Sequence, residues 1–246
     1  MKINVLGVRV DSLTMKEVVS KVEELVEQSL PGWIVTANPE IIYQAQRNEE
    51  LKNLLNSADI ITPDGEGVVW ASRLLGSPVP ERVTGIDLLL NIFPVASKRK
   101  WRMFFLGGAP GVAAEAAAKV REKYPGIMFE HNHGYFRPGE EEQEVLRKIG
   151  EFNPHVLVAG LGAPYQERWI NRHYRKLAIP VSIGVGGSFD VLSGRAKRAP
   201  GWVQRIKLEW LARLISQPWR LKRQADLPKF VFKVLMQKYS LDPRKN

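Results

Sequence analysis

One carboxylate in this chain stands where a sharp turn would present it to a ligand. Asp64 lies between Pro63 and Gly65, in a polar cluster that begins at Thr62, directly after the apolar run Ile60–Ile61. Proline fixes one backbone angle and glycine permits left-handed conformations, so the two flanking residues define the turn. An aspartate held in this way is a candidate general base, which takes a proton from an attacking hydroxyl.

A second polar cluster, Thr36–Pro39, follows the apolar run Trp33–Val35. If the two apolar runs are neighbouring parallel strands, both clusters open onto one rim of the sheet, where α/β proteins bind ligands. Asn38 directly precedes a proline, which also predicts that its side chain caps the start of a helix.

The elements that must position these clusters alternate along the chain. Apolar runs of strand length are followed by amphipathic stretches of helix length, which predicts an α/β fold with a Rossmann-like, mainly parallel sheet flanked by helices. Helical spacing covers Met15–Ser29, a further helix is expected from near Pro39, and another over Val68–Leu75. Residues Met1–Val8 alternate as a strand does.

Three later segments repeat one plan, in which an expected strand ends in a glycine-rich loop. Such loops let backbone N–H groups approach phosphate, and a following helix N-terminus adds partial positive charge. Three of them on one rim indicate nucleotide binding, although Ala109 and Val112 break the dinucleotide fingerprint and the Walker motif is absent from the sequence. The loops are Gly107–Gly111, Gly160–Pro164 and Gly186–Asp190.

Cysteine and paired aspartates are both missing from the sequence. Without cysteine, disulfides, thiol nucleophiles and cysteine-ligated zinc are excluded. Sugar-nucleotide enzymes often hold Mg²⁺ or Mn²⁺ with an Asp-x-Asp pair, and this sequence has none. His131 and His133 lack a third ligand at a telling spacing, so we interpret them as part of a strand-to-loop turn. We therefore expect no metal and no other cofactor.

The net charge of +10 comes from the C-terminal segment. Residues 195–246 carry 14 Lys/Arg against 3 Asp/Glu, whereas residues 1–194 carry 22 against 23. We therefore expect an α/β catalytic domain over 1–195 and a basic, amphipathic α-helical appendage over 196–246.

Two apolar stripes of the appendage lie beside basic residues, as in helices that bind the interface of an anionic membrane. The alternative is that the stripes pack on the sheet or on another subunit, which would leave a homo-oligomer open. We find no signal peptide and no apolar run long enough to span a bilayer. The first stripe is Val203, Ile206, Trp210, Leu211, Leu214 and Ile215, and the second is Phe230, Val231, Val234 and Leu235.

Five blocks together resemble the WecG/TagA/CpsF glycosyltransferase family, in order and over about Asn4 to Pro200. The basic tail resembles the C-terminal appendage of the TagA branch, which works in wall teichoic acid synthesis. The blocks are Thr36–Pro39, Pro63–Val69, Glu81–Asp87, Phe105–Gly108 and Gly160–Glu167.

The resemblance implies an inverting, metal-independent enzyme. It would move N-acetylmannosamine from UDP to the C4 hydroxyl of N-acetylglucosamine on undecaprenyl diphosphate. Asp64 matches the family's proposed base, and Arg82 matches its essential arginine, which we assign to the sugar or the diphosphate. Thr36 and Asn38 would orient donor or acceptor hydroxyls, and the amide of Gln166 would contact UDP.

Further residues are assigned by their place in the expected loops and tail. An arginine from the tail would close over the diphosphate when the tail docks, which makes Arg213, Arg220 and Arg223 candidates. We interpret Glu66 and Asp87 as structural. The candidates for binding the nucleotide are Gly107, Gly108, Tyr135, Gly162 and Asp190.

Several alternatives stay open. The donor could carry N-acetylmannosaminuronic acid or another hexose, and the chain could be a UDP-sugar sensor without turnover. The high isoelectric point of 9.8 also fits a nucleic-acid-binding protein. We disfavour that class because the basic residues flank apolar stripes and we find no nucleic-acid module. The expected location is cytoplasmic and peripheral, on the inner face of the cell membrane.

Overall fold

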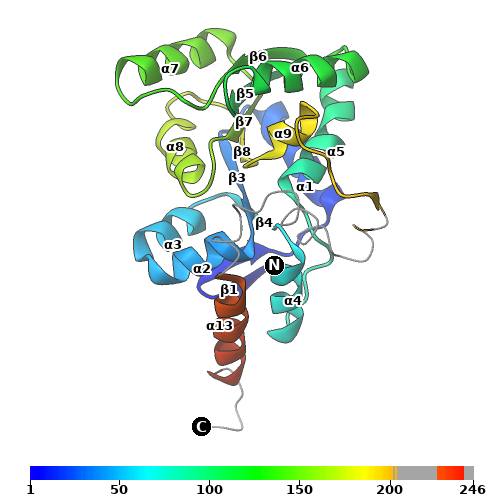
Figure 1. The fold of residues 1–246 in the computed structure, drawn as a ribbon. Helices are drawn as coiled ribbons and strands as arrows, with labels where there is room; N and C mark the ends of the chain where they lie inside the picture. The colour runs from blue at the N-terminus through cyan, green and yellow to red at the C-terminus, as the bar shows by residue number, and fades with distance from the viewer. Residues whose placement is uncertain (202, 204–225, 241–246) are drawn as a thin grey trace.

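The computed structural model describes residues 1–201, 203 and 226–240 (Figure 1). Its centre is a six-stranded sheet in the order β4-β3-β8-β7-β5-β6. All neighbouring strands of this sheet run parallel, which confirms the predicted α/β fold. The strands are β3 (Gly32–Ala37), β4 (Ile60–Pro63), β5 (Arg102–Gly107), β6 (Met128–Asn132), β7 (Val156–Gly160) and β8 (Val181–Gly184).

Helices cover both faces of the sheet (Figure 1). Successive side chains of a strand point to opposite faces, so Trp33 and Val35 enter one apolar core and Ile34 enters the other. The first core includes side chains of α2 (Pro39–Arg47), α3 (Glu49–Asn56), α4 (Glu66–Leu74), α7 (Glu140–Phe152) and α8 (Tyr165–His173). The second includes side chains of α1 (Met15–Gln28), α5 (Gly85–Lys98), α6 (Val112–Lys123) and α9 (Ser188–Leu192).

The helix starts follow the capping residues of the sequence. The Thr14 hydroxyl accepts from the backbone N–H of Glu17, whose carboxylate accepts from the backbone N–H of Thr14 in return, which closes a capping box at the start of α1. Asn38 caps α2, because its Oδ1 accepts from the backbone N–H of Ile41 at 3.0 Å. The predicted helices from Met15 and from Pro39 are therefore confirmed.

The N-terminus differs from the single strand expected over Met1–Val8. It forms an antiparallel hairpin of β1 (Lys2–Val5) and β2 (Val8–Asp11), outside the main sheet. Leu6 and Gly7 turn the chain with φ angles of 51° and 90°. Two consecutive positive φ angles are typical of the tight turns that join the strands of a hairpin.

The last described helix, α13 (Asp226–Ser240), packs against α2 and α4 (Figure 1). Phe230 and Val234 are 1% and 0% exposed, so the expectation that they face a membrane is wrong. The second half of their stripe, Val231 and Leu235, is 40% and 38% exposed. Apolar residues stand on two adjacent rows of this helix, and the domain covers one of them.

Gln237 of α13 also fixes this helix to the N-terminal hairpin. Its Oε1 accepts from the backbone N–H of Leu6, and its Nε2 donates to the carbonyl of Asn4, each at 2.9 Å. The division of the chain near residue 195 stays a prediction. The candidate arginines Arg213, Arg220 and Arg223 lie outside the described residues.

Candidate active site

The two polar clusters lie side by side at the carboxyl ends of β3 and β4, as predicted. Thr36 pairs with Thr62 and Ala37 with Pro63 in the parallel register. The pairing continues past the end of β4, because the backbone N–H of Asp64 donates to the carbonyl of Ala37 at 3.0 Å. Both clusters therefore open onto one rim of the sheet.

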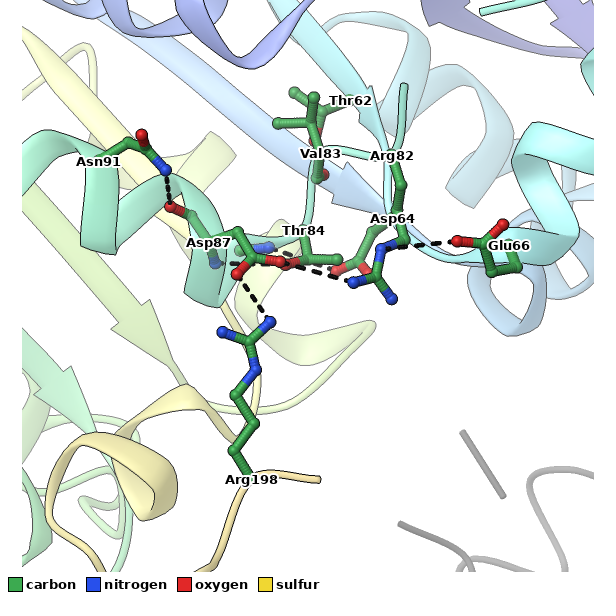
Figure 2. A network of polar contacts seen from close by, with 10 residues as sticks. Thr62, Asp64, Glu66, Arg82, Val83, Thr84, Asp87, Asn91 and Arg198 are labelled. Atoms are coloured by element: carbon green, nitrogen blue, oxygen red, sulfur yellow. Dashed lines mark hydrogen bonds and ion pairs between the residues drawn. The ribbon is translucent and has the colours of Figure 1, made fainter. Parts of the chain in front are cut away.

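Asp64 is half-buried in its turn and directed at the start of α5 (Figure 2). Gly65 follows it with a φ of 114°, a conformation that residues with a side chain rarely adopt. The Asp64 Oδ2 accepts a long hydrogen bond of 3.4 Å from the backbone N–H of Gly85, the first residue of α5. The positive end of the helix dipole favours a negative charge at this place.

The first turn of α5 fits between the ends of β3 and β8 because Gly85 has no side chain. A Cβ on Gly85 would lie 3.2 Å from the Cα of Val185 and 3.4 Å from the Oγ1 of Thr36. Thr36 is buried, and its hydroxyl donates to the carbonyl of Gly184 at 2.9 Å. Thr36 therefore positions β3 against β8 beneath the rim, and its expected contact with a substrate hydroxyl stays a prediction.

Arg82 lies on the same rim, between two carboxylates (Figure 2). Its Nε is 3.9 Å from Oε1 of Glu66, and its Nη2 is 3.7 Å from Oδ2 of Asp87. A second arginine, Arg198, approaches Asp87 from the other side, with its Nη2 2.6 Å from Oδ1. The side chain of Arg82 is 20% exposed, so a ligand at the rim can reach it.

Gln166 joins two of the glycine-rich loops. It is 3% exposed, its Oε1 accepts from the backbone N–H of Gly186 at 3.1 Å, and its Nε2 donates to Oε1 of Glu167 at 2.7 Å. A Cβ on Gly184 would lie 2.8 Å from Nε2 of Gln166, so β8 is also packed tightly against this amide. Gln166 therefore sets the shape of the loop after β8, and its contact with UDP stays a prediction.

The glycine-rich loops meet at the rim, as the three repeated segments predict. The backbone N–H of Gly108 donates to the carbonyl of Gly160 at 3.2 Å, and that of Gly134 donates to Gly108 at 2.8 Å. Gly107 has a φ of 146°, and a Cβ there would lie 2.4 Å from the carbonyl oxygen of Gly160. Only glycine allows this approach of two strands' ends.

The other nucleotide candidates follow three different strands of the sheet. Gly162 follows β7 with a φ of 84°, and Tyr135 follows β6 with 73% of its surface exposed. Asp190 lies in the short helix α9, and its carbonyl accepts from the backbone N–H of Ala196 at 2.8 Å. No direct contact among these three is described, so a common nucleotide site for them stays a prediction.

The family model described as "Glycosyl transferase WecG/TagA/CpsF family" matches residues 3–244. The chain belongs to this family. A Bacillus spizizenii protein is 40% identical over 211 residues, 85% of this chain and 81% of its own, and a Bacillus subtilis protein is 38% identical over the same shares. A Staphylococcus aureus (strain MW2) protein is 35% identical over 246 residues, 99% of this chain and 96% of its own. Each is named N-acetylglucosaminyldiphosphoundecaprenol N-acetyl-beta-D-mannosaminyltransferase.

Membership in the WecG/TagA/CpsF family confirms the resemblance found in the sequence and makes the chain a glycosyltransferase. Within residues 1–201, 203 and 226–240, no group of three or more histidine or acidic side chains could hold a metal ion. His131 ends up in β6 and His133 in the loop that follows, as expected for a strand-to-loop turn.

The sequence did not point to Arg198 as a neighbour of this glycosyltransferase's candidate site. It lies in the basic run after α9, where its charge was counted only as part of the tail. The nearest signal was Asp87, which stands in the same sequence block as Arg82 and two positions after Gly85. Spacing along the chain brings Asp87 near Arg82, but only the tertiary fold brings Arg198 to them.

Proposed function

We propose that the chain transfers N-acetylmannosamine from UDP to N-acetylglucosamine on undecaprenyl diphosphate, which is the linkage-unit step of wall teichoic acid synthesis. The relatives' shared name supports this acceptor and this transferred sugar. The observation that carries the proposal is the half-buried Asp64 at the end of β4, beside Arg82 and the first turn of α5. This arrangement places a proton acceptor near positive charge, and a sugar transfer from a diphosphate needs both.

The proposed reaction uses these groups in one displacement. The Asp64 carboxylate removes the proton from the C4 hydroxyl of the acceptor sugar, and that oxygen bonds to the anomeric carbon of the donor. The bond between the anomeric carbon and the diphosphate oxygen breaks, and UDP leaves with the electron pair. Attack opposite the leaving group inverts the anomeric configuration. Arg82 stabilises the negative charge that develops on the diphosphate.

We also propose that the transfer needs no added metal ion. The sequence lacks the Asp-x-Asp pair with which many sugar-nucleotide enzymes bind Mg²⁺ or Mn²⁺. The rim instead gathers arginine side chains, glycine-rich loops and the N-terminus of α5, all of which present positive charge or N–H donors.

The membrane is the proposed location of the acceptor and of the enzyme. None of the described helices is long and apolar enough to cross a membrane. Helix α13 exposes apolar side chains beside lysines, a combination that binds the interface of an anionic bilayer. The exposed apolar side chains are Val231, Phe232, Leu235, Met236 and Tyr239, and the lysines are Lys229, Lys233 and Lys238.

The proposal is tested with UDP-N-acetylmannosamine and a short-chain lipid diphosphate-N-acetylglucosamine, in the presence of EDTA. Wild type is expected to form the disaccharide with inverted configuration, measured by chromatography and NMR. Asp64→Asn should lower kcat by about 10²–10⁴, because the base is lost while the side chain keeps its size. Glu122→Gln, an exposed change in the last turn of α6, is the control and should keep wild-type turnover.

Three results would contradict parts of this proposal. Turnover by Asp64→Asn at the wild-type rate would refute the assignment of Asp64 as the base. A strict requirement for added Mg²⁺ would refute metal independence. Transfer only from UDP-N-acetylmannosaminuronic acid or from another UDP-hexose would change the donor and leave the assignment of the base intact.

A further inference from the structure

Asp87 joins two arginines that come from distant parts of the chain. Its Oδ2 is 3.7 Å from Nη2 of Arg82, which precedes α5, and its Oδ1 is 2.6 Å from Nη2 of Arg198, which follows α9 (Figure 2). Each carboxylate oxygen thus faces a different guanidinium. The positive charges of Arg82 and Arg198 are thus held close together by the Asp87 carboxylate.

Capping of α5 explains only part of this arrangement. The Thr84 hydroxyl accepts from the backbone N–H of Asp87 at 3.2 Å and donates to Oδ2 of Asp87 at 2.7 Å. These bonds cap the first turn of α5 and need no arginine. A capping role alone therefore gives no reason for Oδ1 of Asp87 to hold Arg198.

The segment that carries Arg198 is fixed along the same side of the site. Arg195 makes a bidentate contact with Glu115 in the first turn of α6, through Nε at 2.8 Å and Nη2 at 2.6 Å. The backbone N–H of Ala196 donates to the carbonyl of Asp190 at 2.8 Å. The chain thus passes the first turn of α6 and then that of α5, which brings Arg198 to Asp87 by a defined path.

The charges at this place suit a diphosphate. The side chains of Arg82 and Arg198 are 20% and 21% exposed, so both are accessible to a ligand, and they lie at the N-terminus of the helix that Asp64 faces. A planar guanidinium matches phosphate oxygens better than a lysine does. A helix N-terminus adds a favourable potential for the same ligand.

We propose that Asp87 is a positioning residue that holds Arg82 and Arg198 as a pair, and that Arg198 binds the diphosphate of the UDP donor. This deepens the proposed function and rests on it. Asp87 itself touches no substrate. It keeps two guanidinium groups beside Asp64 that would repel each other without a carboxylate between them.

The test compares the affinities of the full-length chain for UDP and for uridine by isothermal titration calorimetry. The ratio of the two affinities isolates the contribution of the diphosphate. Arg198→Ala should lower UDP affinity roughly tenfold to a hundredfold and leave uridine affinity within about twofold. Arg198→Lys should recover part of the loss. Asp87→Asn, which keeps an acceptor for Thr84, should lower the ratio in the same direction.

A matched control lies at the other end of α5. Arg99 also contacts two carboxylates, Glu23 at 3.1 Å and Glu27 at 2.6 Å, on α1. Arg99→Ala removes an arginine that makes two ion pairs at the C-terminal end of the helix that carries Asp87, and it should leave the UDP-to-uridine ratio unchanged. Combining Asp87→Asn with Arg198→Ala should cost less than the product of the two single losses, because they act on one contact.

The outcomes that overturn the inference differ from those that overturn the proposed function. An unchanged ratio in Arg198→Ala refutes the diphosphate contact, and a lower melting temperature of Asp87→Asn with an unchanged ratio reduces Asp87 to a helix cap. If wild type binds UDP but does not transfer N-acetylmannosamine, the proposed function fails while the ratio still decides this inference. If wild type binds neither UDP nor uridine, both are refuted.

Discussion

Two phenylalanines of α13, two positions apart, are predicted to have different effects when replaced by alanine. Phe230 is 1% exposed and packs in the core that the first face of the sheet shares with α2 and α4, whereas Phe232 is 61% exposed. Residue type, helix and sequence neighbourhood are the same. The difference between the two variants therefore reports only the direction in which each side chain points.

The expected magnitude follows from burial. Removing a fully buried phenylalanine costs about 3–5 kcal/mol. Helix α13 is then held by the buried Val234 and by two hydrogen bonds of Gln237 to the hairpin, worth roughly 1 kcal/mol each. Phe230→Ala should therefore release α13 locally before the domain unfolds. At 1.4 kcal/mol per factor of ten, the backbone amides of α13 should exchange hydrogen at least about a hundredfold faster in this variant than in wild type.

Hydrogen exchange followed by mass spectrometry measures this directly on peptides of residues 226–240. Phe232→Ala should leave exchange there unchanged, because its ring contributes little to the packing. Its effect should be seen in co-sedimentation with anionic vesicles, where loss of an exposed ring weakens binding. Equal exchange in both variants would refute the docked position of α13, and unchanged vesicle binding by Phe232→Ala would refute the membrane face.

Two further predictions concern the stability of the fold. Gly107→Ala should unfold the domain or lower its melting temperature strongly, because the added Cβ would lie 2.4 Å from the Gly160 carbonyl oxygen. Gly150→Ala in α7, where a Cβ meets nothing within 4 Å, should instead stabilise the domain by up to about 1 kcal/mol. Equal effects of the two substitutions on the melting temperature would refute the close contact between the strand ends. Burial lowers the pKa of His173 from its ordinary value of 6.5, although Glu142, 3.3 Å away, acts to raise it. The stability that the neutral imidazole contributes is therefore fully present above pH 6.5 and is lost as the pH falls through the lowered pKa. The melting temperature should therefore fall less between pH 7 and 5 in His173→Gln than in wild type, as followed by circular dichroism; parallel curves would contradict this assignment.

The sheet and its rim were predictable because they depend on local patterns. Apolar runs of four to six residues followed by glycine or by a capping asparagine predict strands and helix starts without knowledge of the fold. The pairing of β3 with β4 then follows because strands that are consecutive in the sequence are usually neighbours in the sheet. Thr36 and Asp64 were placed on one rim in this way, and the register confirms it.

Other parts of the site depend on contacts that the sequence does not encode locally. Phe230 and Val231 begin two adjacent apolar rows of α13, and helical periodicity gives both rows equal weight. Only the apolar surface offered by α2 and α4 decides which row is buried. Strand β6 was indicated only by the strand-to-loop turn assigned to His131 and His133, because this edge strand carries Glu130 and His131 in place of an apolar run.

Packing around Gly67 connects the turn that carries Asp64 with the proposed membrane face. Gly67 lies three positions after Asp64, and a Cβ there would lie 2.7 Å from Cγ of Pro39 and 3.8 Å from Cε1 of Phe230. The first turn of α4 therefore lies against both the start of α2 and the buried side of α13. Because α13 packs there, its lysines and exposed aromatic side chains are held on the same body as the rim. If the acceptor is anchored in a bilayer, as proposed, this docking sets the orientation of the proposed base Asp64 toward the membrane surface.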